Sequence, residues 1–305
     1  MTSKKDHAQA AEAPTELPEA LAAVVRPGDR VLQIGPGTSA IGLAERTRRP
    51  VTSVHRTPAD ADAVRAPLGP RAVDAQVGDL FEGRPDAAPY DLIVVTAGVR
   101  GLSPRWLDQL APGGAVVAPV ALGGLHPWLL IGPHAGDGLL YGRVLAVDPP
   151  DAGPPPADGR LYETWPAATD DEPPVTETAP PRWLRPLPPR FRPERYGDLW
   201  AWLAGQDDRI TAATVTGTAY VPGCALVVGT SAVHVRPTGL WVTDTEAVTL
   251  TVAEIVAEHV QRWLIQDQPA ITEMTCRVDR PPTARADDLL VAAGWTTSRP
   301  VDLPR

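Results

Sequence analysis

The stretch with the clearest chemical meaning is "GPGTSA", residues 35–40. Gly35 and Gly37 take the first two glycine positions of the G-x-G-x-x-G pattern, and Ala40 stands at the third, where the pattern also allows alanine. An apolar strand before such a turn and a helix after it present free backbone N–H groups to a ligand. The stretch therefore predicts a nucleotide-type cofactor site, and a strand-to-helix turn without a ligand is the alternative.

Two polar residues downstream are candidates to hold the same ligand. His55 stands twenty positions after Gly35, where such sites carry an acid for the ribose hydroxyls. Imidazole can make one such hydrogen bond but cannot accept two donors as a carboxylate does, and an exposed histidine without a ligand is the alternative. Asp79, in "VGDLFEG", could accept the amino group of adenine, with Leu80 or Phe81 packed on the ring. A turn or cap role for Asp79 is the alternative.

Other common active-site chemistry has no counterpart in the sequence. It contains no evident Ser-His-Asp set, no His/Cys metal spacing and no close carboxylate pair, so neither a catalytic side chain nor a metal site is predicted. Cys224 and Cys276 lie far apart and are predicted to be small core residues. His126 and His134 fall in "GGLHPWLLIGPHAG", which is interpreted as a Gly/Pro-rich loop.

Composition narrows the class of protein. With 305 residues, 43% of them hydrophobic, the chain suits two domains with real cores. The formal net charge of -9 argues against a nucleic-acid partner. No apolar signal region follows the first residues, and no apolar run has the length of a membrane span. We therefore expect a cytoplasmic protein without a membrane partner.

Alternating strands and helices are expected to carry the glycine turn, His55 and Asp79. Helices are predicted at 18–25, from Ile41, at 59–68 and at 104–114, and strands at 31–34, 51–56, 71–79, 90–99 and 115–122. The apolar run "YDLIVVTAGV" is typical of a central parallel strand that is buried on both faces. Alternation through about residue 150 predicts an α/β fold with a Rossmann-like, doubly wound sheet.

Residues 148–193 differ in composition from the rest of the chain, because fourteen of the 36 prolines fall there. The segment is predicted to be an extended connector that builds no sheet or helix of any length. It is read as a passive spacer, and docking through Trp183, Leu184 and Phe191 is the alternative.

The order of elements changes after the connector. A helix at 196–205 is followed by strand-like stretches and by an amphipathic helix, for which Thr251 and Glu254 offer a capping box. The stripe of that helix consists of Val252, Ile255, Val256, Val260, Trp263 and Leu264. Strand-like stretches cover 210–221, 224–230, 232–237, 239–245, 275–279 and 292–297. This order predicts a smaller α+β domain, whose tryptophans serve packing first and peptide binding second.

Four stretches carry a resemblance to a known family: "VLQIGPGTSAIGLAER", "VTSVHR", "VGDLFEGRPDAAPYDLIVVTAGV" and "WLDQLAPGGAVVAPV". Their order and spacing resemble those of the protein-L-isoaspartate O-methyltransferases, over about residues 20 to 135. The resemblance implies a Rossmann-like sheet that binds S-adenosylmethionine. By position, it implies a cofactor site made of Gly35, Pro36, Gly37, Thr38, His55, Asp79, Leu80 and Thr96.

The resemblance implies that these residues contact different parts of the cofactor. Gly35 and Gly37 would line its methionine part, and His55 would face the ribose where the family has an acid. Asp79 with Leu80 would hold the adenine. Thr96 would border the mouth shared by cofactor and substrate.

Patterning and this resemblance together predict a flexible N-terminus at 1–16, a cofactor-binding methyltransferase domain at 17–147, the connector at 148–193 and the α+β domain at 194–305. The last is expected to bind substrate or a partner. The expected activity is carboxyl O-methylation of an aspartyl or isoaspartyl group in a peptide or protein. A looser similarity to methyltransferases of lanthipeptide and other modified-peptide pathways points to peptide tailoring. A catalytically decayed scaffold that binds a peptide or a partner enzyme is the alternative, because His55 replaces the acid.

Overall fold

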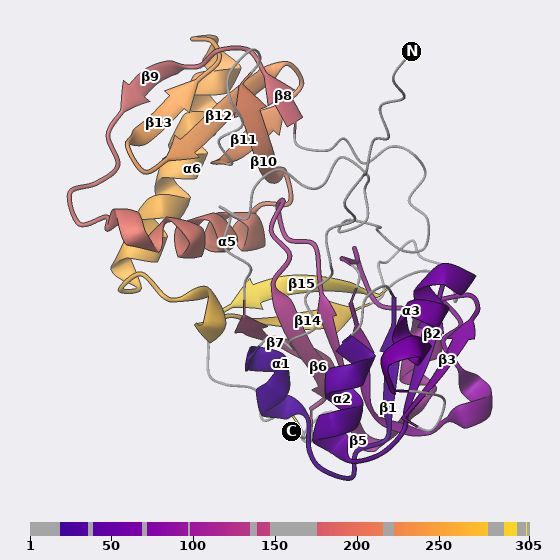
Figure 1. The fold of residues 1–305 in the computed structure, drawn as a ribbon. Coiled ribbons are helices and arrows are strands. Elements are labelled where there is room, and N and C mark those ends of the chain that lie inside the picture. Colours follow the sequence, from indigo (N-terminus) through magenta and orange to yellow (C-terminus); the bar gives the residue numbers. More distant parts are fainter. Residues whose placement is uncertain are drawn as a thin grey trace, which may run out of the picture.

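Two β-sheets dominate the structure. Of the 305 residues, the computed structural model describes 19–35, 39–68, 72–96, 98–134, 139–146, 176–215, 223–279, 290–297 and 303. The predicted flexible segment 1–16 lies outside these residues. One sheet has nine strands and the other has six, and Figure 1 shows the larger below the smaller. The predicted α/β class with a second, smaller sheet is confirmed.

Five parallel strands form one half of the larger sheet, in the order β3-β2-β1-β4-β5. They are β1 (Val31–Ile34), β2 (Val51–His55), β3 (Val73–Val77), β4 (Tyr90–Val95) and β5 (Leu110–Pro119). All four residues of β1 are buried, as expected for a parallel strand that is covered on both faces. The strands predicted in this region are therefore confirmed.

Short helices cover the parallel strands. They are α1 (Glu19–Val24), α2 (Ser39–Thr47), α3 (Pro58–Leu68) and α4 (Pro104–Leu107). Buried residues of α1, α2 and α3, such as Leu21, Leu43 and Val64, share one apolar cluster with Val31 and Val51 of the strands. These three helices therefore cover the same face of the sheet, and the predicted helices at 18–25, from Ile41 and at 59–68 are confirmed.

Helix α4 is shorter than predicted. A helix was expected over 104–114, but it ends at Leu107, and Leu110 already pairs with Tyr90 of the neighbouring strand. The prediction was wrong because the gain from pairing with β4 outweighs the helical pattern of "PRWLDQL".

Strand and helix stop alternating after β5, which corrects a second prediction. The next elements are β6 (Trp128–Pro133) and β7 (Leu140–Ala146), and both pair with their neighbours in antiparallel fashion. The middle of the segment interpreted as a loop, residues 128–133, is therefore a strand, and His126 and His134 lie on either side of it. Its apolar run "WLLIG" is extended because it is enclosed between β5 and β7.

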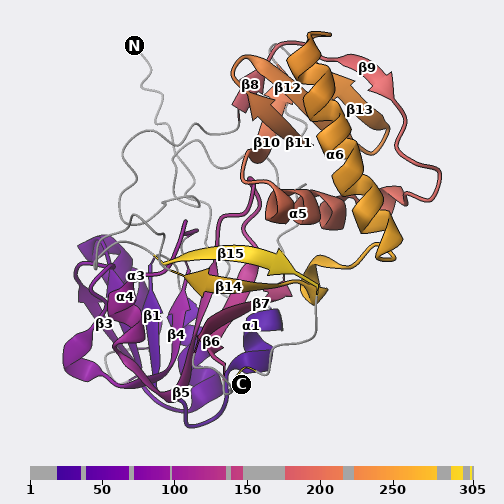
Figure 2. The same cartoon turned by 180° about the vertical axis from the view of Figure 1, so that it is seen from behind.

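The smaller sheet has the order β8-β10-β11-β12-β13-β9. Its central strands are β10 (Ile210–Val215), β11 (Gly223–Val228), β12 (Ser231–Arg236) and β13 (Gly239–Val242). Helices α5 (Tyr196–Gln206) and α6 (Ala247–Ile265) accompany it, and Figure 2 shows α6 lying across the sheet. The predicted helix at 196–205 is confirmed, as are strands within the stretches predicted at 210–221, 224–230, 232–237 and 239–245; residues 216–221 lie outside the described part of the chain.

The connector prediction was wrong for its last part. Residues of the proline-rich segment form β8 (Thr176–Thr178) and β9 (Arg182–Arg185), which are the two edge strands of the smaller sheet. Prolines are tolerated beside edge strands because one side of such a strand needs no N–H donors. Residues 148–175 of the predicted connector lie outside the described part of the chain.

The last two strands return to the larger sheet. β14 (Thr275–Asp279) pairs with β7, and β15 (Val291–Thr296) pairs with β14. The expectation that 194–305 forms one separate domain is therefore wrong for these strands. Sequence pattern shows that they are extended, but not which sheet edge receives them.

Helix α6 begins earlier than its predicted cap. Its first residue is Ala247, and the Thr251 hydroxyl donates a hydrogen bond of 2.8 Å to the Ala247 carbonyl inside the helix. The predicted capping box with Glu254 is therefore wrong. Of the predicted stripe, Val252, Val256, Val260 and Trp263 are buried, whereas Ile255 and Leu264 are partly exposed.

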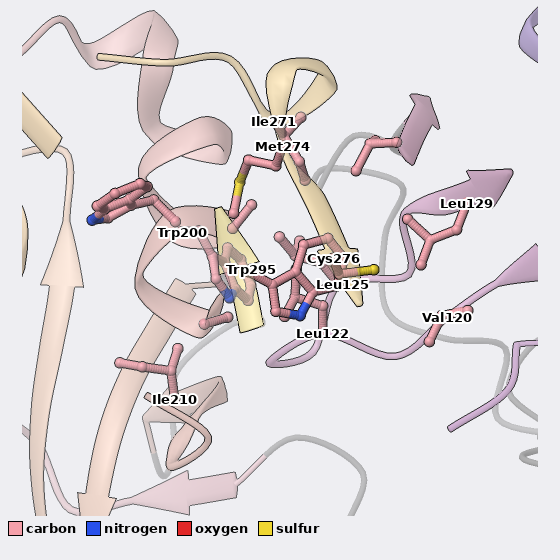
Figure 3. Packing of buried hydrophobic residues seen from close by; sticks show 14 of the residues in the cluster. Val120, Leu122, Leu125, Leu129, Trp200, Ile210, Ile271, Met274, Cys276 and Trp295 are labelled. Carbon is pink, nitrogen blue, oxygen red and sulfur yellow. The ribbon is translucent and has the colours of Figure 1, made fainter. Parts of the chain in front are cut away.

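A shared apolar core joins the two sheets (Figure 3). The turn between β5 and β6 brings Leu122 and Leu125 against Trp200 and Ile210 of the smaller sheet and its helix. Residues of the C-terminal segment belong to the same core, namely Ile271, Met274, Cys276 and Trp295. The predicted packing role is confirmed for the buried Trp200, Trp202, Trp263 and Trp295, whereas Trp183 is 55% exposed.

Both cysteines are buried and free, as predicted. Burial raises the pKa of Cys224 and of Cys276 to about 12, so both thiols stay protonated. Among the described helices, none combines the length and hydropathy that a membrane span requires.

Candidate functional site

The carboxyl ends of β1, β2 and β4 meet at one edge of the larger sheet, together with the turn that follows β3. Three backbone hydrogen bonds tie them together: Gly35 N to Val54 O at 3.1 Å, Gly78 N to His55 O at 3.0 Å and Thr96 N to Ile34 O at 2.9 Å. The predicted residues Gly35, His55, Asp79 and Thr96 are therefore gathered at this edge, although they are distant in sequence. Such an edge is where open parallel sheets bind their ligands.

Gly35 is the described residue of the predicted glycine turn. Its φ of +108° lies in the region that favours glycine, so the chain can turn here without strain. Helix α2 then begins at Ser39. Pro36, Gly37 and Thr38 lie outside the described residues, and their predicted contacts stay predictions.

His55 ends β2, and its side chain is fully buried at 0% exposed. Its Nε2 and Ser53 Oγ share a hydrogen bond of 2.9 Å. Nδ1 makes no hydrogen bond of ordinary geometry with the described residues, although the backbone of Gly35 lies nearby. Burial lowers the pKa of His55 below its ordinary value, so the imidazole is neutral at neutral pH. His55 is therefore a buried histidine and not an exposed one, and its contact with a ligand stays a prediction.

Gln33 is a site residue that the sequence analysis missed. Its side-chain amide donates to Gly35 O at 2.9 Å and to Thr96 Oγ1 at 3.0 Å, and so links the glycine turn to the end of β4. Thr96 Oγ1 in turn donates to Ile34 O at 3.2 Å. A signal was present, because a glutamine inside the otherwise apolar strand "VLQI" is unusual.

Three buried polar atoms at this edge have no hydrogen-bond partner among the described residues: Gln33 Oε1, Ser39 Oγ and His55 Nδ1. The register of β1 with β2 aligns Gln33 with Ser53, so Gln33, Ser53 and His55 occupy one face of the sheet. Helix α2, which begins with Ser39, covers that same face. A buried polar group without a partner costs about 1 to 3 kcal/mol. A polar ligand bound at this edge would provide hydrogen-bond partners for these three atoms.

Asp79 and its neighbours lie just beyond β3. Asp79 is exposed, and its carboxylate accepts a hydrogen bond of 2.9 Å from the backbone N–H of Phe81, which is the geometry of a turn. The Leu80 side chain is only 3% exposed and belongs to the apolar core cluster, and its predicted contact with a ring stays a prediction. Phe81 is partly exposed and is the better candidate to pack on a ring.

The C-terminal segment borders this edge. Leu102, in the loop after β4, exchanges two backbone hydrogen bonds with Leu290, of 2.8 and 2.9 Å. Leu290 directly precedes β15. Residues near position 290 therefore lie beside the loop that follows Thr96.

No metal centre emerges from the residues that the structure describes, since they contain no cluster of three or more His, Cys, Asp or Glu side chains able to hold a metal ion. They also contain no arrangement from which a catalytic side chain can be named. The chemistry that this edge supports is the binding of a polar ligand.

Comparison with known proteins shows which family the first part of the chain resembles. Residues 9–129 match the sequence profile of the family described as Protein-L-isoaspartate(D-aspartate) O-methyltransferase (PCMT). A protein-L-isoaspartate O-methyltransferase of Methanoculleus marisnigri is 45% identical over 101 residues, covering 32% of this chain and 46% of that protein. One of Methylorubrum populi is 42% identical over 136 residues, covering 42% and 63%.

A solved protein-L-isoaspartate O-methyltransferase structure shares 17% identity, with a TM-score of 0.42, over 88% of this chain and 76% of the other. The chain spans about half the length of the curated relatives that it matches. The family profile matches a stretch that contains α1 to β5 and ends at the start of β6.

Proposed function

Because residues 9–129 are related to the protein-L-isoaspartate O-methyltransferases, we propose that this chain is an S-adenosylmethionine-dependent carboxyl O-methyltransferase. Its acceptor would be an aspartyl or isoaspartyl group of a peptide or protein. The observation that carries the proposal is the set of unpartnered buried atoms of Gln33, Ser39 and His55 at the edge of the parallel sheet. Residues 17–147 would form the cofactor-binding part of the molecule.

The residues at the edge fit such a cofactor. S-adenosylmethionine, when bound, supplies a methyl group that its sulfonium centre already activates. Gly35 would border the methionine part, where the absence of a Cβ allows close approach. His55 would give one hydrogen bond to the ribose through Nδ1, and Asp79 would accept one from the adenine amino group. Phe81 or Leu80 would cover the ring.

Positioning is the main task left to the protein. A carboxylate is already a competent nucleophile at neutral pH, so no general base is required, and holding acceptor and donor in line provides the rate gain. Thr96 is suited to border the acceptor, because Gln33 and the Ile34 carbonyl hold its hydroxyl in place. The neutral state of His55 avoids placing a second positive charge beside a cationic cofactor.

The C-terminal segment of the chain would hold the substrate. Leu290 is hydrogen-bonded to Leu102 in the loop region that follows Thr96, which supports a role for the C-terminal segment in contacting a peptide at the mouth of the site. We propose a modified peptide as the natural substrate, on the strength of the looser resemblance noted from the sequence. The two free, buried cysteines suit the reducing cytoplasm expected for the protein.

Isothermal titration with S-adenosylmethionine and with its demethylated product tests the cofactor part of the proposal. Wild-type protein should bind both, and His55→Ala should weaken binding about tenfold, because one hydrogen bond to the ribose is lost. His259→Ala, which changes a partly exposed histidine on α6, is the matched control and should bind as the wild type does.

Methyl transfer needs its own measurement. Mass spectrometry of an isoaspartyl model peptide, beside the same peptide with an ordinary aspartate, should show the gain of one methyl group on at least one of them. Absence of cofactor binding in the wild type would overturn the proposal. Recovery of binding in His55→Glu alone would instead favour the decayed scaffold.

A further inference from the structure

Three buried side chains on and beside α4 form a row of hydrogen-bonding groups. Ser103, Trp106 and Gln109 are spaced three residues apart and are 0%, 1% and 4% exposed. The backbone N–H of Trp106 donates to Ser103 O at 3.2 Å, and that of Gln109 donates to Trp106 O at 3.1 Å. Residues three apart in such turns lie on one side of the helical segment. We call these three residues the α4 row.

The α4 row binds three successive backbone carbonyls of the loop that follows β3. The bonds are Trp106 Nε1 to Leu80 O at 2.8 Å, Ser103 Oγ to Phe81 O at 2.8 Å and Gln109 Nε2 to Glu82 O at 2.7 Å. Connecting loops usually run over the surface, where water can satisfy their carbonyls. Here the protein supplies the donors instead, so the backbone of this loop is fixed at each of the three residues.

Gly83 shows how closely the loop fits the row. Its φ is +64°, and an added Cβ would lie only 2.9 Å from Gln109 Oε1. That oxygen accepts a hydrogen bond of 2.8 Å from the backbone N–H of Arg84. Gln109 Nε2 also donates to the Arg105 carbonyl at 2.8 Å. The loop therefore lies against an amide group that is itself held in place.

The same loop carries the residues proposed to hold adenine. Asp79 is exposed, and its carboxylate accepts a hydrogen bond of 2.9 Å from the backbone N–H of Phe81. Ser103 binds the carbonyl of that same Phe81. Both backbone groups of Phe81 are thus engaged, one by the Asp79 carboxylate and the other by the α4 row. A side chain that never meets the ligand can in this way orient the carboxylate.

We propose that Ser103, Trp106 and Gln109 are positioning residues for base recognition. They hold the loop at 79–82 so that the Asp79 carboxylate accepts from the amino group of adenine and rejects a base that carries an oxygen there. The inference rests on the proposed function, because it assigns a task to the loop that would hold the cofactor. It goes further by naming the residues that make this loop selective.

Rigidity of the carboxylate is what selectivity requires. A base with a carbonyl oxygen in place of the amino group would put one hydrogen-bond acceptor opposite another. A fixed Asp79 cannot turn away from this contact, whereas a mobile one can, so loosening the loop lowers the discrimination between the two bases. If α4 served only to stabilise the fold, its variants would lose stability and keep the same preference for adenine.

Isothermal titration with two forms of the demethylated cofactor tests the inference. The probes are S-adenosylhomocysteine and S-inosylhomocysteine, in which an oxygen replaces the amino group of the base. We expect the wild type to bind the adenosyl form about tenfold more tightly. In Trp106→Phe and in Ser103→Ala this ratio should fall to about threefold or less, because the adenosyl form binds more weakly.

Trp200→Phe is the matched control for Trp106→Phe. Trp200 is also 1% exposed, and its indole nitrogen also donates to a backbone carbonyl at 2.8 Å, that of Gly123. Urea unfolding should show a similar loss of stability in both variants, while the control keeps the wild-type ratio. Ser103 also caps α4, so Trp106→Phe decides alone if circular dichroism shows that Ser103→Ala does not fold.

The outcomes separate this inference from the proposed function. A wild-type ratio in both Trp106→Phe and Ser103→Ala, or an equal fall in Trp200→Phe, would leave α4 with a structural role only and overturn the inference. Equal binding of the two probes by the wild type would also overturn it, while cofactor binding itself stands. A wild type that binds neither probe would overturn the proposed function together with the inference.

Discussion

The indole nitrogen of Trp200 on α5 donates a hydrogen bond of 2.8 Å to the carbonyl oxygen of Gly123, in the turn between β5 and β6. Trp200 is 1% exposed, so this bond lies within the core that joins the two sheets. Each sheet contributes one partner. The smaller sheet is therefore packed on the larger one rather than tethered to it.

Trp200→Phe should lower the free energy of unfolding by about 1 kcal/mol. The variant keeps most of the aromatic packing but leaves the Gly123 carbonyl without its donor. Urea unfolding followed by circular dichroism measures the change. Trp202→Phe is the control, because its indole nitrogen donates over a longer distance, 3.2 Å, to the His259 carbonyl. An equal or larger loss in the control would contradict the special role of the Trp200 bond.

Gly123→Ala should destabilise the joint between the sheets more than backbone conformation alone explains. Its φ is +56°, and an added Cβ would collide with the Ala204 side chain and lie 3.0 Å from the Ile210 carbonyl oxygen. We expect a loss of about 2 to 4 kcal/mol, from left-handed strain together with overpacking.

Gly229→Ala separates these two causes. Gly229 has a similar φ of +61°, but an added Cβ would meet nothing within 4 Å. It should cost only about 1 kcal/mol. If both variants lose the same stability in urea, the close approach of the turn to α5 is not the decisive contact.

Gln33→Leu should impair both stability and cofactor binding. The change keeps an apolar strand but removes the donor that serves the Gly35 carbonyl and the Thr96 hydroxyl. We expect unfolding to become easier by about 1 to 3 kcal/mol, because buried acceptors lose their partner. Thermal unfolding with and without S-adenosylmethionine gives both effects in one experiment.

Gln76→Leu provides the comparison for Gln33. Gln76 is on β3, which β2 separates from β1, and its amide donates only to the exposed Asp74 carboxylate, at 2.6 Å, among the bonds that the structure describes. The stability of Gln76→Leu should match that of the wild type. The rise of its unfolding temperature on adding cofactor should match as well. If cofactor raises the unfolding temperature of Gln33→Leu as much as that of the wild type, Gln33 is not part of the cofactor site.

Stability should fall in acid partly because of His234. This residue is 1% exposed, shares a hydrogen bond of 2.7 Å with Thr178, and has its pKa lowered by burial from 6.5 to about 4. The unfolded chain therefore binds the proton at a higher pH than the folded chain does. This contribution to stability is complete above pH 6.5 and is lost as the pH falls from 6.5 toward about 4.

His234→Gln keeps a hydrogen-bonding side chain beside Thr178 but cannot titrate. Between neutral pH and about pH 4 the wild type should lose about 3 kcal/mol more than the variant. Urea unfolding across this range measures the difference. His55 and His259, whose pKa values burial also lowers, remain in both proteins and so cancel in the comparison. Parallel pH profiles would show that His234 is not the group responsible.

Local sequence was sufficient for the parallel half of the larger sheet. Runs such as "VLQI" and "YDLIVV" are apolar throughout, which is typical of strands buried on both faces, and each is followed by turn residues. The same patterning located α5 and the strands β10 to β13 of the smaller sheet. The glycine turn, His55, Asp79 and Thr96 could also be named from spacing and resemblance, and the structure gathers their described members at one edge.

Tertiary structure decided which edges pair. The pattern of β14 and β15 indicates extended chain, but only packing against β7 assigns them to the larger sheet. β8 and β9 are too short and too rich in neighbouring prolines to be recognised without the strands that they join. Likewise, the burial of His55 and the bonds from Gln33 to Gly35 and Thr96 exist only once β1, β2 and β4 lie side by side. Periodicity reports how a segment is buried, whereas the partner that buries it is set by contacts between residues far apart in the chain.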